Sequence, residues 1–175
     1  SSVAWEKFGA MYRRTGRFQG KEVAALFSGQ GGQYPTMFED VAKNWPPFRE
    51  WLVHMGKAFQ AENPQCPDLT KAMYPREKYA DETSSNSEEV ARLADTRYAQ
   101  PAVLAASLGC YEIFRAAGLS PSFTSGHSLG ELAALHISGI LPEKEDVCSV
   151  VCRRASLMAA ECGGGDGSSG KAPKY

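Results

Sequence analysis

Apolar residues in this chain fall into short continuous runs and longer stripes of helical spacing that alternate along the sequence. Residues 23–27, Val-Ala-Ala-Leu-Phe, form a continuous apolar run that ends at a glycine-rich turn. Such a run is typical of a strand buried on both faces. A second, less apolar run at 121–124 leads into another glycine-rich turn. Because strands alternate with helices, the pattern predicts an α/β fold with a parallel sheet.

Five stretches have the apolar periodicity of helices. The predicted helices cover residues 36–44, 48–59, 100–117 and 131–138, and a stretch that begins at Pro142. Gly118 and Gly139 are expected to end two of them, because glycine tolerates the left-handed conformation that follows many helices. Residues 60–86 are rich in Pro, Asn, Asp and Ser, and we expect a long surface connection there.

The last helix and the two ends of the chain complete the organisation. The buried stripe of the last helix is predicted to consist of Val147, Val150, Val151, Leu157 and Met158. Residues 1–21 carry five basic side chains against Glu6 alone, which predicts a short amphipathic helix or a basic linker. Residues 163–175 are rich in glycine and serine and are expected to be a flexible tail.

Composition narrows the class of protein. The chain has 175 residues, 43% hydrophobic and 22% charged, which suits one globular domain. A net charge of −1 does not indicate a nucleic acid or a membrane surface as partner, and no apolar run reaches the ~18 residues of a membrane span. The chain begins Ser-Ser and shows no signal peptide, so we expect a module of a longer polypeptide.

Five cysteines, an odd number, follow no disulfide framework, so we expect reduced thiols and a cytoplasmic location. Cys148 and Cys152 lie four residues apart on a predicted helix, but no further ligands stand at metal-site spacing near them. They are interpreted as small buried residues.

The second glycine-rich turn, Gly126-His127-Ser128-Leu129-Gly130, matches the pattern Gly-x-Ser-x-Gly. It stands between a predicted strand and a predicted helix, where such a turn exposes the serine hydroxyl at the end of the sheet. The N–H of Leu129 would lie at a helix N-terminus, where it could donate to a developing oxyanion. The simpler interpretation is a strand-to-helix turn with a capping serine.

A nucleophilic serine needs a base, and the chain has three histidines. His127 adjoins Ser128, and adjacent side chains in a tight turn diverge. His136 is eight residues further along a helix, about 12 Å away at ~1.5 Å per residue. His54 stands among apolar residues, which favours a packing role. We therefore expect the base to lie outside this chain, or the chain alone to be inactive.

The first glycine-rich turn, residues 29–33, fits neither phosphate-binding fingerprint, since it lacks Gly-x-Gly-x-x-Gly and no Gly-Lys-Ser/Thr follows. It lies at the same predicted sheet edge as Ser128, where its backbone N–H groups could serve the oxyanion.

Four motifs in this order resemble those of malonyl-CoA:acyl-carrier-protein transacylases, the acyltransferase domains of fatty acid and polyketide synthases. They are Ser28-Gly29-Gln30-Gly31-Gly32-Gln33-Tyr34, Gln100-Pro101-Ala102, Gly126-His127-Ser128-Leu129-Gly130-Glu131 and Arg153. Four further segments are most similar to the acyltransferase domains of polyunsaturated fatty acid synthases. They are Phe27-Ser28-Gly29-Gln30, Asn44-Trp45-Pro46, Tyr74-Pro75-Arg76 and Cys152-Arg153-Arg154-Ala155. The resemblance covers about residues 22–160.

The resemblance implies an α/β-hydrolase-like large subdomain over residues 22–162, with a short parallel sheet flanked by helices. It implies that the family's ferredoxin-like small subdomain and catalytic histidine, which come later in relatives, are absent from this chain. The expected partners are an acyl carrier protein, neighbouring synthase domains and the C-terminal half of the acyltransferase domain. Malonyl-CoA and the phosphopantetheinylated carrier protein are the expected substrates, with no tightly bound cofactor and no metal.

The resemblance also implies a role for each site residue. Ser128 would take up the malonyl group and pass it to the phosphopantetheine thiol. The backbone N–H groups of Gln30 and Leu129 would form the oxyanion hole. Arg153, at the family spacing after Ser128, would bind the malonyl carboxylate with its fork of donors. The acyl pocket would be lined by two further residues, Gln100 and His127.

Two other functions stay open on the sequence. Because no histidine is a convincing base, the chain could be a catalytically incompetent scaffold or interaction module of a synthase. A Gly-x-Ser-x-Gly esterase would need an acid and a histidine downstream of Ser128, and only His136 is there.

Overall fold

A two-stranded parallel sheet forms one side of the molecule in the computed structural model, which describes residues 4–7, 10–13, 22–75 and 91–163. Strand β3 (Ala24–Phe27) pairs with β4 (Phe123–Gly126), with Ala24 opposite Phe123 and Phe27 opposite Gly126. Both strands end at the same edge, where the two glycine-rich turns follow. The predicted α/β class with a short parallel sheet is confirmed.

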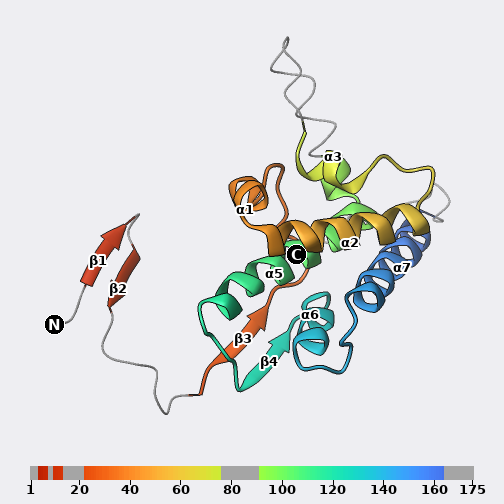
Figure 1. The fold of residues 1–175 in the computed structure, drawn as a ribbon. Helices are drawn as coiled ribbons and strands as arrows, with labels where there is room; N and C mark the ends of the chain where they lie inside the picture. The colour runs from red at the N-terminus through yellow and green to blue at the C-terminus, as the bar shows by residue number, and fades with distance from the viewer. Residues whose placement is uncertain (1–3, 8–9, 14–21, 76–90, 164–175) are drawn as a thin grey trace, which may run out of the picture.

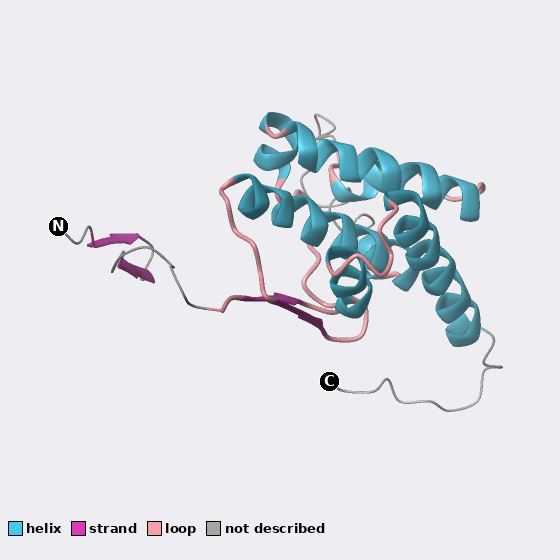
Figure 2. Cartoon of the chain, turned by 60° about the horizontal axis from the view of Figure 1, so that its bottom comes forward, coloured by secondary structure: helices cyan, strands magenta, loops and turns pink. Residues whose placement is uncertain are grey.

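Helices make up most of the remaining described chain (Figure 1). They are α1 (Glu39–Asn44), α2 (Pro46–Glu62), α3 (Leu69–Met73), α5 (Thr96–Ala116), α6 (Gly130–Ile137) and α7 (Lys144–Gly163). The long helices α2, α5 and α7 pack against one another, and α6 packs against both strands of the sheet. In Figure 2 the helices gather on one side, with β3 and β4 at their border.

The hydrophobic core lies where α2, α5 and α7 meet. From α2 it takes four large side chains that are fully buried: Phe48, Trp51, Met55 and Phe59. By contrast, Leu26 of β3 is 77% exposed and Phe123 of β4 is 56% exposed. The sheet is therefore covered on one face, and the described residues leave its other face open.

Two helices begin earlier than predicted. Helix α2 starts at Pro46, because proline suits the first helical position, where its missing N–H loses no bond. Helix α5 starts at Thr96, and Asp95 caps it by accepting a hydrogen bond from the N–H of Arg97. Gly118 and Gly139 follow the ends of α5 and α6 with φ of 87° and 80°, as predicted.

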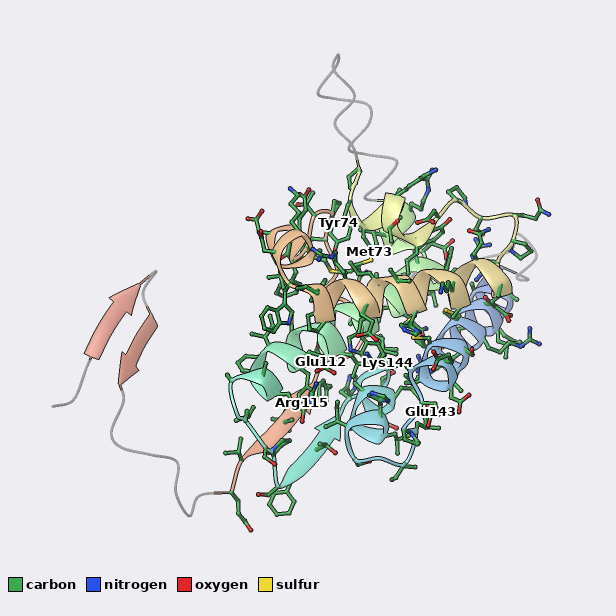
Figure 3. The ribbon with its side chains drawn as sticks, in the orientation of Figure 1. Met73, Tyr74, Glu112, Arg115, Glu143 and Lys144 are labelled. Carbon is green, nitrogen blue, oxygen red and sulfur yellow. The ribbon has the colours of Figure 1, made fainter. Side chains whose placement is uncertain are left out.

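A short helix, α3, interrupts the segment that was expected to be a surface connection. Its Asp68 cap accepts from the N–H of Thr70, and Leu69, Ala72 and Met73 are buried. Figure 3 shows Met73 and the adjacent Tyr74 at the end of this helix, on the side of α1. Burial raises the pKa of Tyr74 to about 12, with Glu39 of α1 adding to the effect.

The predicted buried stripe of α7 is partly wrong. Val147 and Val151 are fully buried, but Val150, Leu157 and Met158 are 42%, 52% and 41% exposed. The face that packs against α2 and α5 is instead completed by small residues, namely Cys148, Cys152 and Ala155. Close helix packing selects small side chains, so Val150 and Leu157 lie on the exposed face, and Met158 lies at the border, where its sulfur contacts Gln100.

The chain ends differ from the expectation where they are described. Within residues 1–21, where a short amphipathic helix or a basic linker was expected, the described residues form two antiparallel strands: β1 (Ala4–Lys7) and β2 (Ala10–Arg13). The predicted glycine- and serine-rich tail lies outside the described residues from 164 on. Among the helices that the structure describes, none is both long enough and apolar enough to cross a membrane.

Candidate active site

Ser128 stands at a strained turn between β4 and α6. Its φ of 52° lies in the left-handed region, which a residue with a Cβ rarely adopts. The backbone turns so sharply that Ser128 stays exposed while Leu129, next along the chain, is buried at 1% exposure. The predicted strand–turn–helix context of a nucleophilic serine is thus present, and strain of this kind is concentrated at functional sites.

The turn is tight because its two glycines let backbone segments touch. A Cβ on Gly126 would lie 2.0 Å from the carbonyl group of Gly130. A Cβ on Gly130 would lie 2.2 Å from the carbonyl oxygen of Phe27 and 2.8 Å from that of Ser28. The start of α6 therefore sits directly on the end of β3, which brings the two glycine-rich turns together.

One arginine reaches the serine, and it is Arg154 of α7. Its Nη2 donates to Ser128 Oγ over 3.1 Å, and its Nη1 donates to Oε1 of Gln100 on α5. Gln100 is the one fully buried polar side chain among the described residues, and its Nε2 lies 3.3 Å from the sulfur of Met158. Gln100 therefore lies behind the guanidinium and holds it toward Ser128.

Arg153, which the resemblance assigns to the malonyl carboxylate, contacts α2 in this structure. Its Nη1 donates to Oε1 of Glu62 on α2 over 2.8 Å, and its side chain is 65% exposed. Consecutive helix residues point about 100° apart, so the two arginines leave α7 in different directions, with the exposed Val150 and Leu157 between them. Arg153 turns toward α2, and Arg154 turns toward α5 and Ser128. The sequence assigned no role to Arg154, because its contact with Ser128 depends on how α7 packs.

The two backbone N–H groups expected at the oxyanion hole belong to neighbouring segments. Gln30 lies in the turn after β3, and Leu129 directly precedes α6. Neither N–H has an acceptor within the described part of the chain. His127 is exposed beside Ser128, and a Cβ on Gly29 would come within 2.9 Å of its Nδ1. His127 therefore packs over the first turn at the edge of the site.

The other two histidines have partners away from Ser128. His136 Nδ1 lies 2.7 Å from the carbonyl oxygen of Leu141, and its ring stands edge-on to Trp51. His54 is partly exposed and lies 3.0 Å from Oε1 of Glu145, so it belongs to a surface cluster and not to the core. Neither is placed to accept the proton of Ser128.

Other chemistry within the described residues is sparse. They contain no group of three or more metal-ligating side chains. Cys66, Cys110, Cys148 and Cys152 are free thiols, and burial raises the pKa of the last two to about 12. An open hollow on α7, lined by Ser149, Val150, Leu157, Met158 and the two arginines, adjoins the site.

Comparison with known proteins identifies the class. The sequence model of the acyl transferase domain family matches residues 25–174, so the chain belongs to this family. The predicted resemblance to acyltransferase domains of polyketide and fatty acid synthases is confirmed.

Individual relatives are similar to this chain in sequence, and two solved structures are also similar to it in fold. A polyunsaturated fatty acid synthase polypeptide from Thraustochytrium sp. is 39% identical over 163 residues, which cover 90% of this chain and 6% of the relative. The crystal structure of MCAT from Streptococcus pneumoniae is 30% identical with a TM-score of 0.63, covering 79% of this chain and 39% of that one. A malonyl-transacylase solved with a type II polyketide synthase acyl-carrier protein is 28% identical with a TM-score of 0.62, covering 80% and 40%.

The chain spans about 6% of the length of that curated synthase and about two fifths of the two solved transacylases.

Proposed function

We propose that this chain carries the acyl-accepting serine of an acyltransferase domain, which moves a malonyl group from malonyl-CoA to the phosphopantetheine thiol of an acyl carrier protein. The observation that carries the proposal is the contact of Ser128 Oγ with a guanidinium at a strained strand-to-helix turn. Membership of the acyl transferase family and the named substrates of similar transacylases support it.

The reaction proceeds by two acyl transfers. A base removes the proton of Ser128 Oγ, and the oxygen attacks the thioester carbonyl of malonyl-CoA. The C–S bond breaks, coenzyme A leaves as a thiol after taking up a proton, and a seryl ester remains. The phosphopantetheine thiolate then attacks this ester, and Oγ leaves and regains a proton. In both steps the carbonyl oxygen becomes negative, and the N–H groups of Gln30 and Leu129 would donate to it.

Arg154 is the proposed clamp for the free carboxylate of the malonyl group. A guanidinium offers two parallel donors that match a carboxylate and stays charged at any working pH. In the ligand-free site one end of the fork donates to Ser128 and the other to Gln100. A bound carboxylate would replace the serine as the partner of Nη2, while Gln100 keeps the side chain in place.

The adjacent arginine provides a matched control. We would measure Ser128 labelling from malonyl-CoA and acetyl-CoA by intact mass in wild type, Arg154→Ala, Arg154→Lys and Arg153→Ala. Loss of a charge-assisted contact of about 1.5–3 kcal/mol predicts that Arg154→Ala reduces malonyl labelling about 10–100-fold relative to acetyl labelling. Arg153→Ala loses an exposed ion pair and should change the ratio less than about twofold.

Arg154→Lys keeps the charge without the fork, so it should recover part of the malonyl preference if folding is intact. Equal labelling of wild type by the two thioesters would refute malonyl selectivity. Loss of the preference in Arg153→Ala alone would assign the clamp to Arg153.

A second candidate function is an acyltransferase portion that is inactive by itself and acts as a scaffold. The observation in its favour is that neither His54 nor His136 faces Ser128, and His127 packs over Gly29. The same positions disfavour an esterase, because His136 is held by a backbone carbonyl. Added imidazole separates the candidates: acylation of Ser128 that rises with imidazole indicates a nucleophile that lacks its base. A folded chain without any adduct at Ser128, even with imidazole, would favour the scaffold.

A further inference from the structure

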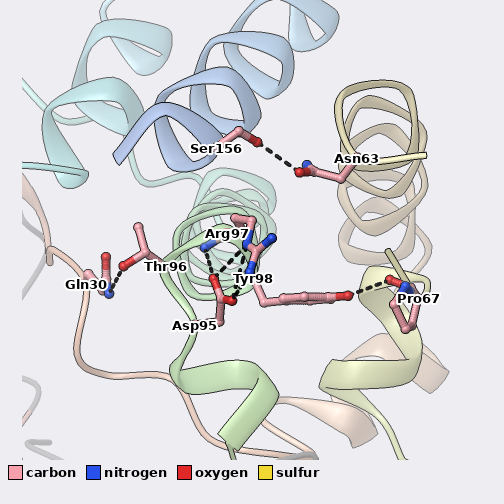
Figure 4. Close-up of polar contacts among 8 residues, drawn as sticks. All are labelled: Gln30, Asn63, Pro67, Asp95, Thr96, Arg97, Tyr98 and Ser156. Atoms are coloured by element: carbon pink, nitrogen blue, oxygen red, sulfur yellow. Dashed lines mark hydrogen bonds and ion pairs between the residues drawn. The ribbon is translucent and has the colours of Figure 1, made fainter. Parts of the chain in front are cut away.

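Thr96 makes a hydrogen bond that ties the first glycine-rich turn to α5. Nε2 of Gln30 donates to Oγ1 of Thr96 over 3.2 Å, across a long separation in sequence (Figure 4). Gln30 is exposed and Thr96 is partly exposed, so the bond adds little to the stability of the fold. Its position is more informative than its strength, because the backbone N–H of the same Gln30 is a proposed oxyanion donor.

The anchor itself is well fixed. Thr96 is the first residue of α5, directly after the Asp95 cap. The carboxylate of Asp95 accepts from the N–H of Arg97 and also pairs with its guanidinium over 2.6 Å, as Figure 4 shows. The start of α5 therefore has a defined position, and so does the hydroxyl of Thr96.

One face of α5 serves two parts of the site. Thr96 and Gln100 are four residues apart, so they lie one above the other on the same side of the helix. Thr96 contacts the turn that carries Gln30, and Gln100 contacts Arg154. Helix α5 therefore contacts both the residue proposed as oxyanion donor, Gln30, and the residue proposed as carboxylate clamp, Arg154, and helps to fix their positions relative to Ser128.

The turn packs against His127 and Gly130, but few side chains form hydrogen bonds to it. Among the described residues, Thr96 provides the one side-chain hydrogen bond to residues 28–34 from outside that segment. The other side-chain bond, from the N–H of Gly31 to Oε1 of Gln33, is internal to it. Three glycines in the turn offer no side chains to pack, so this tether is the side-chain hydrogen bond that can orient the Gln30 peptide.

From these contacts we infer that Thr96 is a positioning residue, which holds the side chain of Gln30 so that its backbone N–H points at the oxyanion that forms on the acyl group of Ser128. This inference rests on the proposed function. Thr96 touches neither the substrate nor Ser128 and acts through Gln30. Its loss should lower the rate of the acyl-transfer step and leave malonyl-CoA binding unchanged.

The test compares Thr96→Val, which keeps the shape and removes the acceptor, with Thr96→Ser, which keeps the hydroxyl. Single-turnover acylation of Ser128 is followed by intact mass on the full chain over a range of malonyl-CoA concentrations, with imidazole as external base. Loss of a whole oxyanion donor costs about 100–1000-fold, so a misdirected donor should cost about tenfold in the maximal rate. The half-saturating concentration should stay the same, and Thr96→Ser should restore the rate.

Thr70→Val is the matched control, because it removes the hydroxyl that bonds to Asp68 on α3, away from the site. Its acylation rate should equal that of wild type. Gln30→Ala tests the route of the effect: if Thr96 acts through this side chain, the double variant should be no slower than Gln30→Ala alone. Strictly additive losses, or a Thr96→Val variant with the wild-type maximal rate, would overturn the inference, as would equal losses in Thr96→Val and Thr96→Ser.

A fluorophosphonate probe separates this inference from the proposed function, since it modifies a reactive serine without recognising malonyl. Wild type that reacts with the probe but not with malonyl-CoA would refute malonyl transfer. The comparison of Thr96→Val with Thr96→Ser would then still decide the role of Thr96, because the phosphonyl oxygen uses the same donors.

Discussion

Alanine at position 130 tests the close approach on which the serine turn depends. The new Cβ would lie 2.2 Å from the carbonyl oxygen of Phe27, whereas carbon and oxygen atoms in proteins rarely approach closer than about 3.3 Å. The backbone fixes the position of the Cβ, and its partner is a backbone carbonyl, so no side-chain rotation can relieve the collision. The start of α6 must therefore move away from β3 by about 1 Å.

The size of the effect follows from two opposing contributions. Overpacking costs about 1–3 kcal/mol, and a backbone collision belongs at the upper end of that range. Alanine in place of glycine at a helix terminus recovers less than about 1 kcal/mol. A net loss of about 2 kcal/mol should lower the melting temperature by about 4–8 °C in a chain of this size. Displacing Leu129 from Gln30 by about 1 Å should slow acylation of Ser128 about 100-fold.

Thermal unfolding followed by circular dichroism and single-turnover acylation give the two readouts. Gly56→Ala is the control, because it makes the same chemical change inside α2, where no atom lies within 4 Å of the added Cβ. It should raise stability by about 0.5–1 kcal/mol and leave acylation unchanged. A Gly130→Ala variant that melts and reacts like wild type would refute the close contact between α6 and β3.

Three further predictions concern packing and ionisation. Gly109→Ala should destabilise the chain by about 1–3 kcal/mol in urea titrations, since its Cβ would lie 2.5 Å from Cδ2 of Phe48, and Phe48→Leu should recover part of the loss. Leu157→Gln should change stability by less than about 0.5 kcal/mol, because this side chain is 52% exposed; a larger loss would mean that it is packed. Burial raises the pKa of Cys148 and Cys152 from 9.0 to about 12, so the folded state keeps protons that the unfolded chain releases. In reducing buffer the free energy of unfolding should therefore lose the contribution of these thiols as pH rises from 9 to 12, and Cys148→Ala should weaken that dependence.

The sequence predicted the elements whose signal is local. The apolar run at 23–27 predicted a strand, and β3 lies there, but the expected burial on both faces is not found because Leu26 is 77% exposed. The Ser128 turn was predictable because glycine spacing reports close backbone contact, which the positions of Gly126 and Gly130 confirm. The signal for α3 was present as well: Asp68 two residues before Thr70 is a helix cap, although five helical residues are too few for periodicity.

What depended on tertiary packing was not predictable. Val150 and Val151 are adjacent and have the same side chain. Val150 is exposed and Val151 is buried, because one face of α7 packs against α2 and α5. The same choice decides which of two adjacent arginines meets Ser128. The spacing after Ser128 indicates which turn of α7 lies near the serine, but the packing of α7 decides which arginine contacts it.

In the proposed reaction, the length of the malonyl group requires a guanidinium close to the nucleophile. Its free carboxylate lies only two carbon–carbon bonds from the carbonyl carbon that Ser128 attacks, so any clamp must stand beside the serine. Arg154 meets this condition through its 3.1 Å contact, whereas Arg153 is paired with Glu62 on α2. The guanidinium cannot accept a proton, so the same contact cannot supply the base. In the proposed function Arg154 selects the acyl group, and none of the three histidines is placed to take the proton of Ser128, so added imidazole should speed acylation.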